Sequence, residues 1–477
     1  MRTSALLPLF LVALAPRAGA QVANAAARVD SVFTAYTNTT PGCAVAVDRN
    51  GRTVLARAYG MADLEHDVAN TPATIMEAGS VSKQFTATAI ILLALDGKLS
   101  LDDDVRKHVP ELPDYGEPIT IRHMLNHISG LRDWGSVAGI AGWPRTTRVH
   151  THDHVVDILS RQRGVNFPPA QEYSYSNSGY NLMAVIVDRV SGMSFADFSK
   201  QRIFEPLGMH DTQWRDDHTR IVKNRAVAYS GGRGGVSIDM PFENVHGNGG
   251  LLTTVGDLLI WNRHLETGSV FGPRYHELMH TRGVLRDGEQ IGYASGLMIG
   301  TYAGVPEVSH TGSTAGYRAF LARYPEQQLS IALLCNVGSA NPGGLGHDVA
   351  DLYLPPQPAV AQGGGRGGRG GGGGGGGGRG GRGGEAFTLT PAQLAEYAGD
   401  YYSPDVEITV QLVVEDGRLF ALRRPSDRLG FTPQSRDEFN AQSFGSVTFY
   451  RDASGRITQF GIRQGRVYDL RFDRVQR

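Results

Sequence analysis

The stretch that decides the fold is Ser80-Val81-Ser82-Lys83-Gln84-Phe85, together with the apolar run that continues to Leu95. Residues 84–95 favour a helix, and Gly97 ends it. Residues i and i+3 share a helix face, so the Ser80 hydroxyl and the Lys83 amine can meet. A serine hydroxyl is a weak nucleophile, and a lysine can activate it if burial and the positive helix start lower the lysine pKa. The same helix start favours a developing oxyanion.

An S-x-x-K pattern alone is also compatible with a surface helix that begins at a capping serine. A second element, Tyr175-Ser176-Asn177, follows 95 residues later. A tyrosine beside Lys83 can relay the Ser80 proton and later protonate a leaving group. Asn177 can hold a substrate amide. Tyr36-Thr37-Asn38 has the same Y-x-N pattern, but it precedes the serine and lacks the flanking residues.

The third element is His310-Thr311-Gly312, which is expected to open a strand that continues into Tyr317 and Phe320. Gly312 would let a substrate backbone approach closely. The N–H of Ser313 could pair with that of Ser80 as an oxyanion hole. A lone histidine is also compatible with an ordinary surface or core position. The interpretation of this element as part of a substrate site therefore depends on the other two elements.

Taken in order, the three elements resemble the serine β-lactamase and penicillin-binding D-peptidase superfamily, most closely its class C β-lactamase and D-alanyl-D-alanine carboxypeptidase branch. The resemblance covers about residues 28–345 and includes further stretches in family order: Ile119–Gly130, Tyr175–Tyr180, Pro206–Met209, Gly249–Leu251, and Pro325 with Asn336. It implies that Ser80 is the nucleophile, that Lys83 and Tyr175 transfer protons, and that His310, Thr311, Gly312, Ser313 and Asn177 bind substrate. Whether Lys83 or Tyr175 is the acylation base stays open.

Two departures from the family pattern bear on the substrate. Most β-lactamases of the superfamily have a lysine in the third element, which binds the antibiotic carboxylate; here it is His310, a residue largely neutral at pH 7. This resembles certain D-peptidases, D-aminopeptidases and esterases. No Glu-x-x-Leu-Asn element follows Tyr175, so the class A water-activating glutamate is missing. Short esters or peptides with D-residues are therefore favoured over β-lactams.

The fold class expected for residues 21–355 is an α/β (α+β) β-lactamase-like fold, with a mixed antiparallel sheet, a helical layer and a helical subdomain. Residues 42–60 predict a hairpin, and strands return near 296–301, 319–323 and 330–335. Helices are expected at Asn181–Val190 and, after a capping box at Thr254–Asp257, through Trp261 and His264. Cys43 and Cys335 lie in strand-like segments, and the pattern leaves open whether they are bonded or free thiols.

Residues 356–384 predict a flexible linker, because 363–384 is almost pure glycine interrupted by arginine. Arg/Gly tracts can bind RNA, but the linker interpretation is preferred. Residues 385–477 alternate apolar and polar side chains between tight turns at Asp416-Gly417 and Gln464-Gly465, which predicts a small all-β barrel. From Tyr397-Ala398-Gly399 onward this part resembles a lipocalin-like domain.

Residues 1–20 predict a signal peptide, with Arg2, an apolar run, and Ala18-Gly19-Ala20 as a cleavage site, so the protein is expected to be exported to a periplasm or secreted. An uncleaved anchor is the alternative, but the run is short of the roughly 20 residues that span a bilayer. The net charge of −1 gives no general attraction to nucleic acid or anionic membrane. Two cysteines, and fifteen histidines without ligand spacing, indicate no metal. No cofactor is expected.

Three functions remain open. The first is an exported serine hydrolase that acts on a small-molecule or peptide substrate through an acyl-enzyme on Ser80, as an esterase, D-peptidase such as a carboxypeptidase, or β-lactamase. The second is a penicillin-binding or sensing protein that is acylated but hardly turns over. In the third, the C-terminal barrel binds an apolar ligand or a partner, although its large side chains are more often plain barrel core. No stable membrane insertion and no nucleic-acid partner are expected, and the pattern does not predict the oligomeric state.

Overall fold

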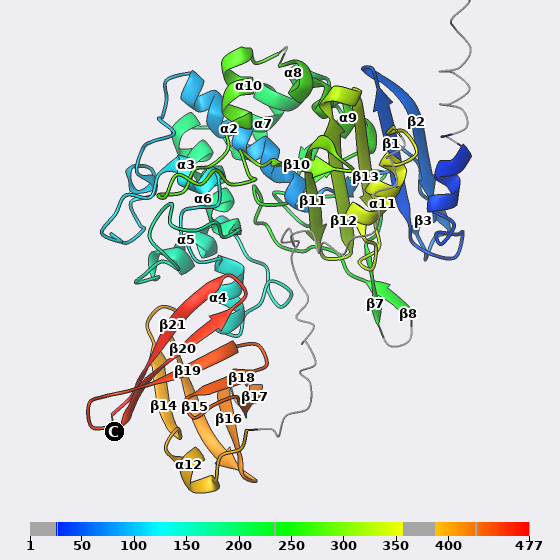
Figure 1. Ribbon diagram of the computed structural model, residues 1–477. Helices are drawn as coiled ribbons and strands as arrows, with labels where there is room; N and C mark the ends of the chain where they lie inside the picture. The colour runs from blue at the N-terminus through cyan, green and yellow to red at the C-terminus, as the bar shows by residue number, and fades with distance from the viewer. Residues whose placement is uncertain are drawn as a thin grey trace, which may run out of the picture.

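The computed structural model describes residues 25–476, apart from residue 26 and the segments 233–234, 269, 356–386 and 425–426. The signal-peptide prediction for 1–20 and the linker prediction for 356–384 lie outside the described residues. The described chain forms an α/β domain and, beyond residue 386, a β-barrel placed below it in Figure 1.

The α/β domain is organised around one antiparallel sheet with the strand order β10-β11-β12-β13-β1-β2. It joins the two ends of the domain, because β1 pairs with β13 in a register that places Cys43 opposite Cys335. These two cysteines form a disulfide, which settles the alternative that the sequence leaves open. The strand bounds are β1 Cys43–Arg49, β2 Arg52–Tyr59, β10 Met298–Tyr302, β11 Val305–Thr314, β12 Tyr317–Tyr324 and β13 Leu329–Cys335.

Both faces of the sheet are covered, so its central strands are buried along nearly their whole length. Ala44 and Ala46 of β1 join the large core that contains Phe85 of helix α2 (Lys83–Leu95) and Trp261 of α9 (Val255–Thr267). Val45 and Val47 face the other way, toward Val349 of α11 (Pro342–Ala350). Successive strand residues point to opposite faces, so one strand contributes to two cores.

The remaining helices form the layer around α2 on the left of Figure 1, as the fold-class prediction has it. Their bounds are α3 Ile121–Leu125, α4 Trp134–Ile140, α5 His152–Ser160, α6 Asn177–Ser191, α7 Phe195–Ser199, α8 Glu205–Leu207 and α10 Pro273–His280. Short strands connect them: β3 Met61–Asp63, β4 Val68–Ala69, β5 Met76–Glu77, β6 Gln213–Trp214, β7 Tyr229–Gly232, β8 Gly235–Ile238 and β9 Leu251–Thr253. Within the described residues, no helix is both long and apolar enough to cross a bilayer.

Two local expectations differ from the structure. The His310-Thr311-Gly312 element does not open a strand that continues into Tyr317: it lies in the second half of β11, and the chain reverses before β12. The reversal uses Ala315, which has a positive φ of 44°. Thr254 does cap α9 by accepting from the N–H of Asp257, but the reciprocal half of the capping box is replaced by bonds from Asp211 and Thr212 to the Asp257 carboxylate.

The C-terminal part is a closed eight-stranded barrel, β14 to β21 in sequential order, preceded by the short helix α12 (Pro391–Ala395). The predicted alternation is present, with Phe439, Val447 and Leu470 directed into the core. The strand bounds are β14 Gly399–Ser403, β15 Ile408–Glu415, β16 Arg418–Arg424, β17 Asp427–Pro433, β18 Glu438–Ala441, β19 Gly445–Arg451, β20 Ile457–Gln464 and β21 Val467–Arg474.

Helix α4 of the α/β domain docks on the barrel, next to the ends of β20 and β21 (Figure 1). Val137 and Ile140 of α4 belong to the same apolar core as the barrel interior. Arg423 of the barrel donates to the last carbonyls of α4, those of Gly139 at 2.7 Å and Ile140 at 2.6 Å. A cation at a helix C-terminus is favourable because it meets the negative end of the helix dipole. The barrel is therefore packed directly against the domain that carries the candidate catalytic residues.

Candidate active site

Ser80 and Lys83 lie in the turn that leads into α2, as the spacing predicts. Ser80 is part of a 3-10 turn (η1, Gly79–Ser82), and α2 continues from Lys83. Lys83 is fully buried, and its Nζ lies 3.3 Å from Ser80 Oγ, 2.9 Å from Asn177 Oδ1 and 2.7 Å from the Asn248 carbonyl oxygen. The structure thus brings the first two sequence elements together around one amine.

These surroundings favour the neutral form of Lys83. Burial lowers its pKa well below the usual lysine value, the nearby Arg466 lowers it further, and Asp133 partly opposes both. A neutral amine has two protons and one lone pair. The two carbonyl-type oxygens, Asn177 Oδ1 and Asn248 O, can only accept, so they take the two protons. The lone pair is left for the Ser80 hydroxyl, which is the arrangement a general base requires.

Tyr175 precedes α6 and lies against the same amine, with its ring centre 4.7 Å from Lys83 Nζ. Its hydroxyl is buried and makes no hydrogen bond of regular geometry with the described residues. Burial raises the Tyr175 pKa above its usual range, although the Ser80 hydroxyl and Arg466 act in the opposite direction. The Tyr175 hydroxyl therefore stays protonated beside Ser80, where it can donate a proton.

The third element borders the site from the side of the sheet. A side chain at Gly312 would meet the Ala78 carbonyl oxygen, and one at Gly79 would come within 2.5 Å of the Ser313 nitrogen. The backbones of β11 and η1 are therefore in direct contact, with the Ser313 and Ser80 amides on neighbouring segments. Thr311 lies between His310 and Gly312 in β11 and is paired with Phe320 of β12.

His310 is buried behind this edge. Its Nδ1 lies 2.6 Å from the Thr311 carbonyl oxygen, which can only accept, so Nδ1 carries the proton and Nε2 accepts from the Tyr293 hydroxyl at 3.1 Å. Burial, followed by the effect of Lys83, lowers the His310 pKa to about 4. His310 is neutral at pH 7 and supplies no positive charge to a ligand.

Sequence reasoning missed Asp133, a nearly buried carboxylate at the junction of two helices. It caps α4 by accepting from the Ser136 N–H at 3.1 Å, and it accepts from the Asn177 N–H at the start of α6 at 2.9 Å. The positive charge of Arg466, followed by the two N–H hydrogen bonds, lowers the Asp133 pKa despite burial. Asp133 thereby fixes the position of Asn177, which in turn accepts from Lys83. No short motif marks it.

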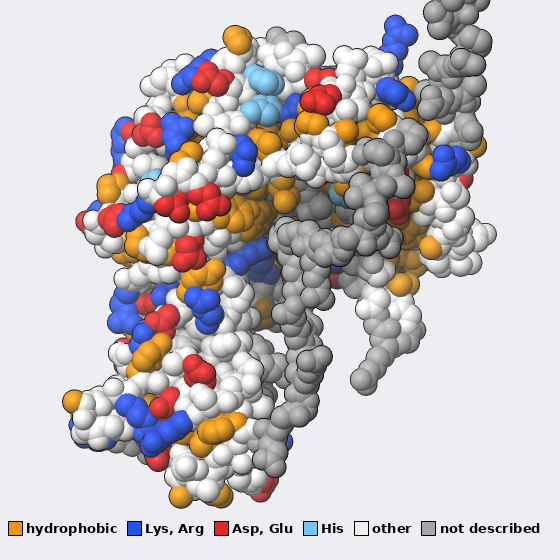
Figure 2. All heavy atoms as spheres, in the orientation of Figure 1, with side chains coloured by type: hydrophobic (Ala, Val, Ile, Leu, Met, Phe, Trp, Pro, Cys, Tyr) orange, Lys and Arg blue, Asp and Glu red, His pale blue; other side chains and the backbone are white. Residues whose placement is uncertain are grey.

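Sequence reasoning also missed Arg466, which comes from the barrel. It sits in the turn between β20 and β21, where the sequence predicts a tight turn at Gln464-Gly465. Its Cζ lies 4.7 Å from the centre of the Tyr175 ring and its Nη1 lies 3.5 Å from Asp133 Oδ2. On the face shown in Figure 2, basic side chains gather where the barrel meets the α/β domain. No pattern in the sequence links a barrel turn to a serine almost 400 residues earlier.

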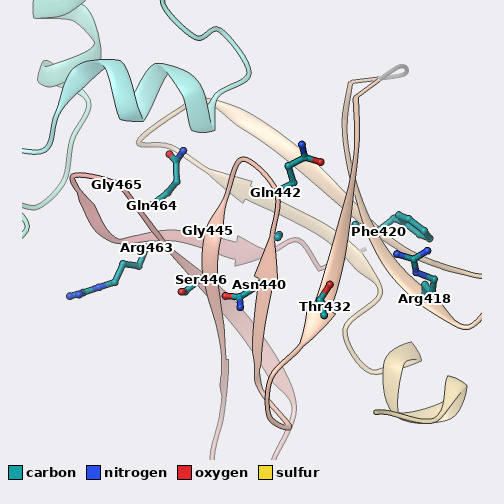
Figure 3. Close-up of a pocket in the computed structure, with 12 residues that line it drawn as sticks. Arg418, Phe420, Thr432, Asn440, Gln442, Gly445, Ser446, Arg463, Gln464 and Gly465 are labelled. Atoms are coloured by element: carbon teal, nitrogen blue, oxygen red, sulfur yellow. The ribbon is translucent and has the colours of Figure 1, made fainter. Parts of the chain in front are cut away.

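A hollow lies on the barrel (Figure 3). It has a volume of about 680 Å³ and is lined by outward-facing side chains of β16 to β20, including Arg418, Phe420, Thr432, Asn440, Ser446 and Arg463. The barrel interior is filled by phenylalanine and aliphatic side chains. This hollow is an open surface groove and lacks a nucleophile paired with a base, so the chemistry belongs to the site around Ser80.

Several known proteins are similar to this chain. The sequence model of the Beta-lactamase family matches residues 29–353. The D-aminopeptidase of Brucella canis is 29% identical over 327 residues, which are 68% of this chain and 62% of that protein. Penicillin-binding protein 4* of Bacillus subtilis is 31% identical over 299 residues, 58% of this chain and 64% of that protein. The chain thus matches a little over three fifths of the length of these relatives.

Solved structures show the same fold. The octameric penicillin-binding protein homologue from Pyrococcus abyssi is 24% identical with a TM-score of 0.60, and the match covers 96% of this chain and all of that one. The D-amino acid amidase from Ochrobactrum anthropi SV3 is 24% identical with a TM-score of 0.58, over 70% of this chain and 97% of that one. At this identity the likeness concerns the fold alone.

Proposed function

Because this chain belongs to the β-lactamase family of serine hydrolases, we propose that it hydrolyses an ester or a peptide amide bond through an acyl-enzyme on Ser80. The observation that carries the proposal is the contact of 3.3 Å between Ser80 Oγ and the buried Nζ of Lys83, whose pKa is lowered well below the usual value. The family supplies the reaction class, and this contact supplies the activated nucleophile.

In the first step, Ser80 Oγ attacks the carbonyl carbon and its proton passes to the lone pair of Lys83 Nζ. The carbonyl π electrons move to the oxygen, and the N–H groups of Ser80 and Ser313 stabilise that oxyanion. Collapse of the intermediate breaks the bond to the leaving group, which takes a proton from the Tyr175 hydroxyl; the proton on Lys83 then restores Tyr175. This assigns Lys83 as the acylation base and Tyr175 as the acid.

In the second step, water replaces the leaving group. It gives a proton to the same Lys83–Tyr175 pair, attacks the acyl carbon, and expels Ser80 Oγ, which regains its proton. Asn177 keeps the amine in place throughout, because its Oδ1 accepts from Lys83 Nζ and its N–H is fixed by Asp133. Thr311 and Gly312 flank the substrate along the edge of β11.

The proposed substrates are short peptides or amides with D-residues, or small esters. The D-aminopeptidase among the similar proteins supports this class. Efficient β-lactam hydrolysis is less favoured, because His310 is neutral and buried. We further propose that the protein is exported, which the signal-like start of the chain supports. The Cys43–Cys335 disulfide supports it as well, since such bonds persist in oxidising compartments.

Intact-protein mass spectrometry tests the nucleophile. Wild type, Ser80→Ala and Ser82→Ala are treated briefly with a fluorophosphonate probe and, separately, with a penicillin. Wild type and Ser82→Ala should each gain one fluorophosphonate, and Ser80→Ala none. Labelling of Ser80→Ala, or no labelling of wild type, contradicts the proposal.

The penicillin arm then separates the alternatives. An adduct that forms and decays within the assay means β-lactamase turnover, and one that persists means a penicillin-binding or sensing protein. No penicillin adduct beside a fluorophosphonate adduct indicates an esterase or peptidase.

A further inference from the structure

Arg466 reaches the active site from the barrel, and hydrogen bonds from the α/β domain hold its backbone there. Its carbonyl oxygen accepts from the Asp133 N–H at 3.3 Å and from Asn166 Nδ2 at 2.9 Å. The Tyr468 N–H donates to Asn166 Oδ1 at 2.8 Å. Gly465, at φ 57°, brings the turn so close that an added Cβ would lie 3.4 Å from Ser136 Oγ of α4. The turn is clamped between α4 and the segment before α6.

The side chain of Arg466 has unused hydrogen-bonding capacity. A guanidinium has five N–H donors. Within the described part of the chain, the Arg466 side chain pairs with Asp133 at 3.5 Å and lies over the Tyr175 ring. It donates no hydrogen bond to these residues. The Asp133 carboxylate already accepts hydrogen bonds from the Asn177 and Ser136 N–H groups. The Arg466 side chain is 28% exposed, so an arriving ligand can approach it.

The other cations near Ser80 are occupied or uncharged. Lys83 is buried and engaged with Ser80, Asn177 and Asn248. The charge of Arg145 is balanced by Glu243, because its Nε and Nη2 donate to the two oxygens of that carboxylate. His310 is neutral. Arg466 is thus a partly exposed cation at this site, and among the described residues its only ionic partner is Asp133 at 3.5 Å.

The position also fits a substrate of limited length. Lys83 Nζ and Arg466 Cζ each lie 4.7 Å from the centre of the same Tyr175 ring, and Lys83 Nζ touches Ser80 Oγ. An extended peptide spans roughly 3.5 Å per residue. A substrate held at Ser80 therefore reaches Arg466 with a group that lies within about three residues of the scissile bond.

We propose that Arg466 binds a carboxylate of the substrate, and that the barrel thereby makes this site selective for short substrates with a free carboxylate near the scissile bond. The planar guanidinium offers two parallel N–H groups that match a carboxylate. A substrate ammonium group at the same place would lie beside the positive guanidinium of Arg466. Substrates with a free amine there are therefore disfavoured. This inference rests on the proposed role of Ser80 for the place of the scissile bond.

Binding to the Ser80→Ala variant tests the selectivity without turnover. The ligands are N-acetyl-D-alanyl-D-alanine and its C-terminal amide, which differ only in the carboxylate, and the readout is calorimetric Kd. The carboxylate should bind about 10- to 100-fold more tightly than the amide. Adding Arg466→Gln should remove most of that ratio, and Arg466→Lys, which keeps the charge and loses the paired N–H groups, should retain part of it.

Arg456→Ala is the matched control. Arg456 lies at the opposite end of β20, is 79% exposed and pairs with Asp452 of its own turn, so its removal should leave the ratio unchanged. Thermal unfolding shows whether a variant is folded. If an Arg466 variant does not fold, the ratio of the two Kd values in Ser80→Ala with Arg466 intact still tests the proposal. No preference for the carboxylate in that protein overturns the proposal. Equal weakening of both ligands by Arg466→Gln overturns it too, because that result means a purely structural clamp.

Failure of the proposed function gives a different result. Wild-type hydrolysis of the neutral ester p-nitrophenyl acetate, and its loss in Ser80→Ala, reports on the serine chemistry independently of charge. Absence of Ser80-dependent turnover and labelling contradicts the proposed function. The ratio of Kd values in the Ser80→Ala background still confirms or overturns the role of Arg466.

Discussion

The Asp405 carboxylate of the barrel accepts a hydrogen bond of 2.6 Å from Arg132 of the α/β domain, and the two side chains are only 4% and 6% exposed. Arg163 donates to the other carboxylate oxygen at 2.8 Å. One buried anion thus connects the barrel to the segment before α4 and the segment after α5. Since Arg466 depends on the position of the barrel, this connection also matters for the active site.

Replacing Asp405 with asparagine should destabilise the protein by about 3–5 kcal/mol, because it leaves the buried Arg132 charge without its partner. The free energy of unfolding from urea titration measures the effect. Glu407→Gln is the control: Glu407 pairs with Arg161 at the exposed surface, and such pairs contribute about 1 kcal/mol or less. Equal losses for the two variants would contradict a buried anchor at Asp405.

The acid limb of the pH profile should report on Lys83. Its pKa is lowered by burial and by Arg466, so kcat/KM for a neutral ester should rise with pH as Lys83 loses its proton, well below the usual lysine range. Lys83→Ala should lower kcat/KM by roughly 10²- to 10⁴-fold.

Arg466→Gln removes a positive neighbour of Lys83. The ammonium form then becomes less unfavourable, the Lys83 pKa rises, and the acid limb should move to higher pH. The pH dependence of kcat/KM with the same neutral ester measures the shift, and Arg456→Ala should leave the limb in place. A shift to lower pH would show that another group controls the acid limb.

Gly312→Ala should lower kcat/KM by about 100-fold or more, because the new methyl group meets the Ala78 carbonyl and separates β11 from the Ser80 turn. Gly300→Ala on the neighbouring strand β10 is the control, since nothing lies within 4 Å of its added Cβ. It should change the free energy of unfolding by about 0.5 kcal/mol at most. If Gly312→Ala keeps full activity, β11 does not form the oxyanion hole.

The double variant Cys43→Ala with Cys335→Ala should unfold more readily, by about 2–5 kcal/mol. The disulfide closes a loop between positions 292 residues apart, and its removal restores chain entropy to the unfolded state. Calorimetric unfolding under oxidising and reducing conditions measures the stability that the disulfide contributes. Wild type should lose stability on reduction, and the double variant should not respond. An unchanged Tm on reduction of wild type means that the bond contributes little.

How much could be predicted from the sequence depends on the range of the interactions. The Ser80-Lys83 contact was predictable, because both residues belong to one helical turn. The alternation of apolar and polar residues, together with tight turns, predicted a small barrel. One of these turns is at Asp416 and Gly417, which both have a positive φ. The extent of the strand that carries His310 was predicted wrongly, because the chain reverses at Ala315 and Gly316 and so separates β11 from Tyr317 in β12.

By itself the sequence determined the family, the helix that carries Ser80 and Lys83, and the pattern of each strand, since these follow from local spacing and the period of apolar residues. Only the tertiary structure decided that Asp133 fixes Asn177, that His310 is buried and neutral, and that Arg466 faces Tyr175 across the domain boundary. The physical reason is that burial, charge state and contacts between distant segments arise when the chain packs, and no local pattern encodes them.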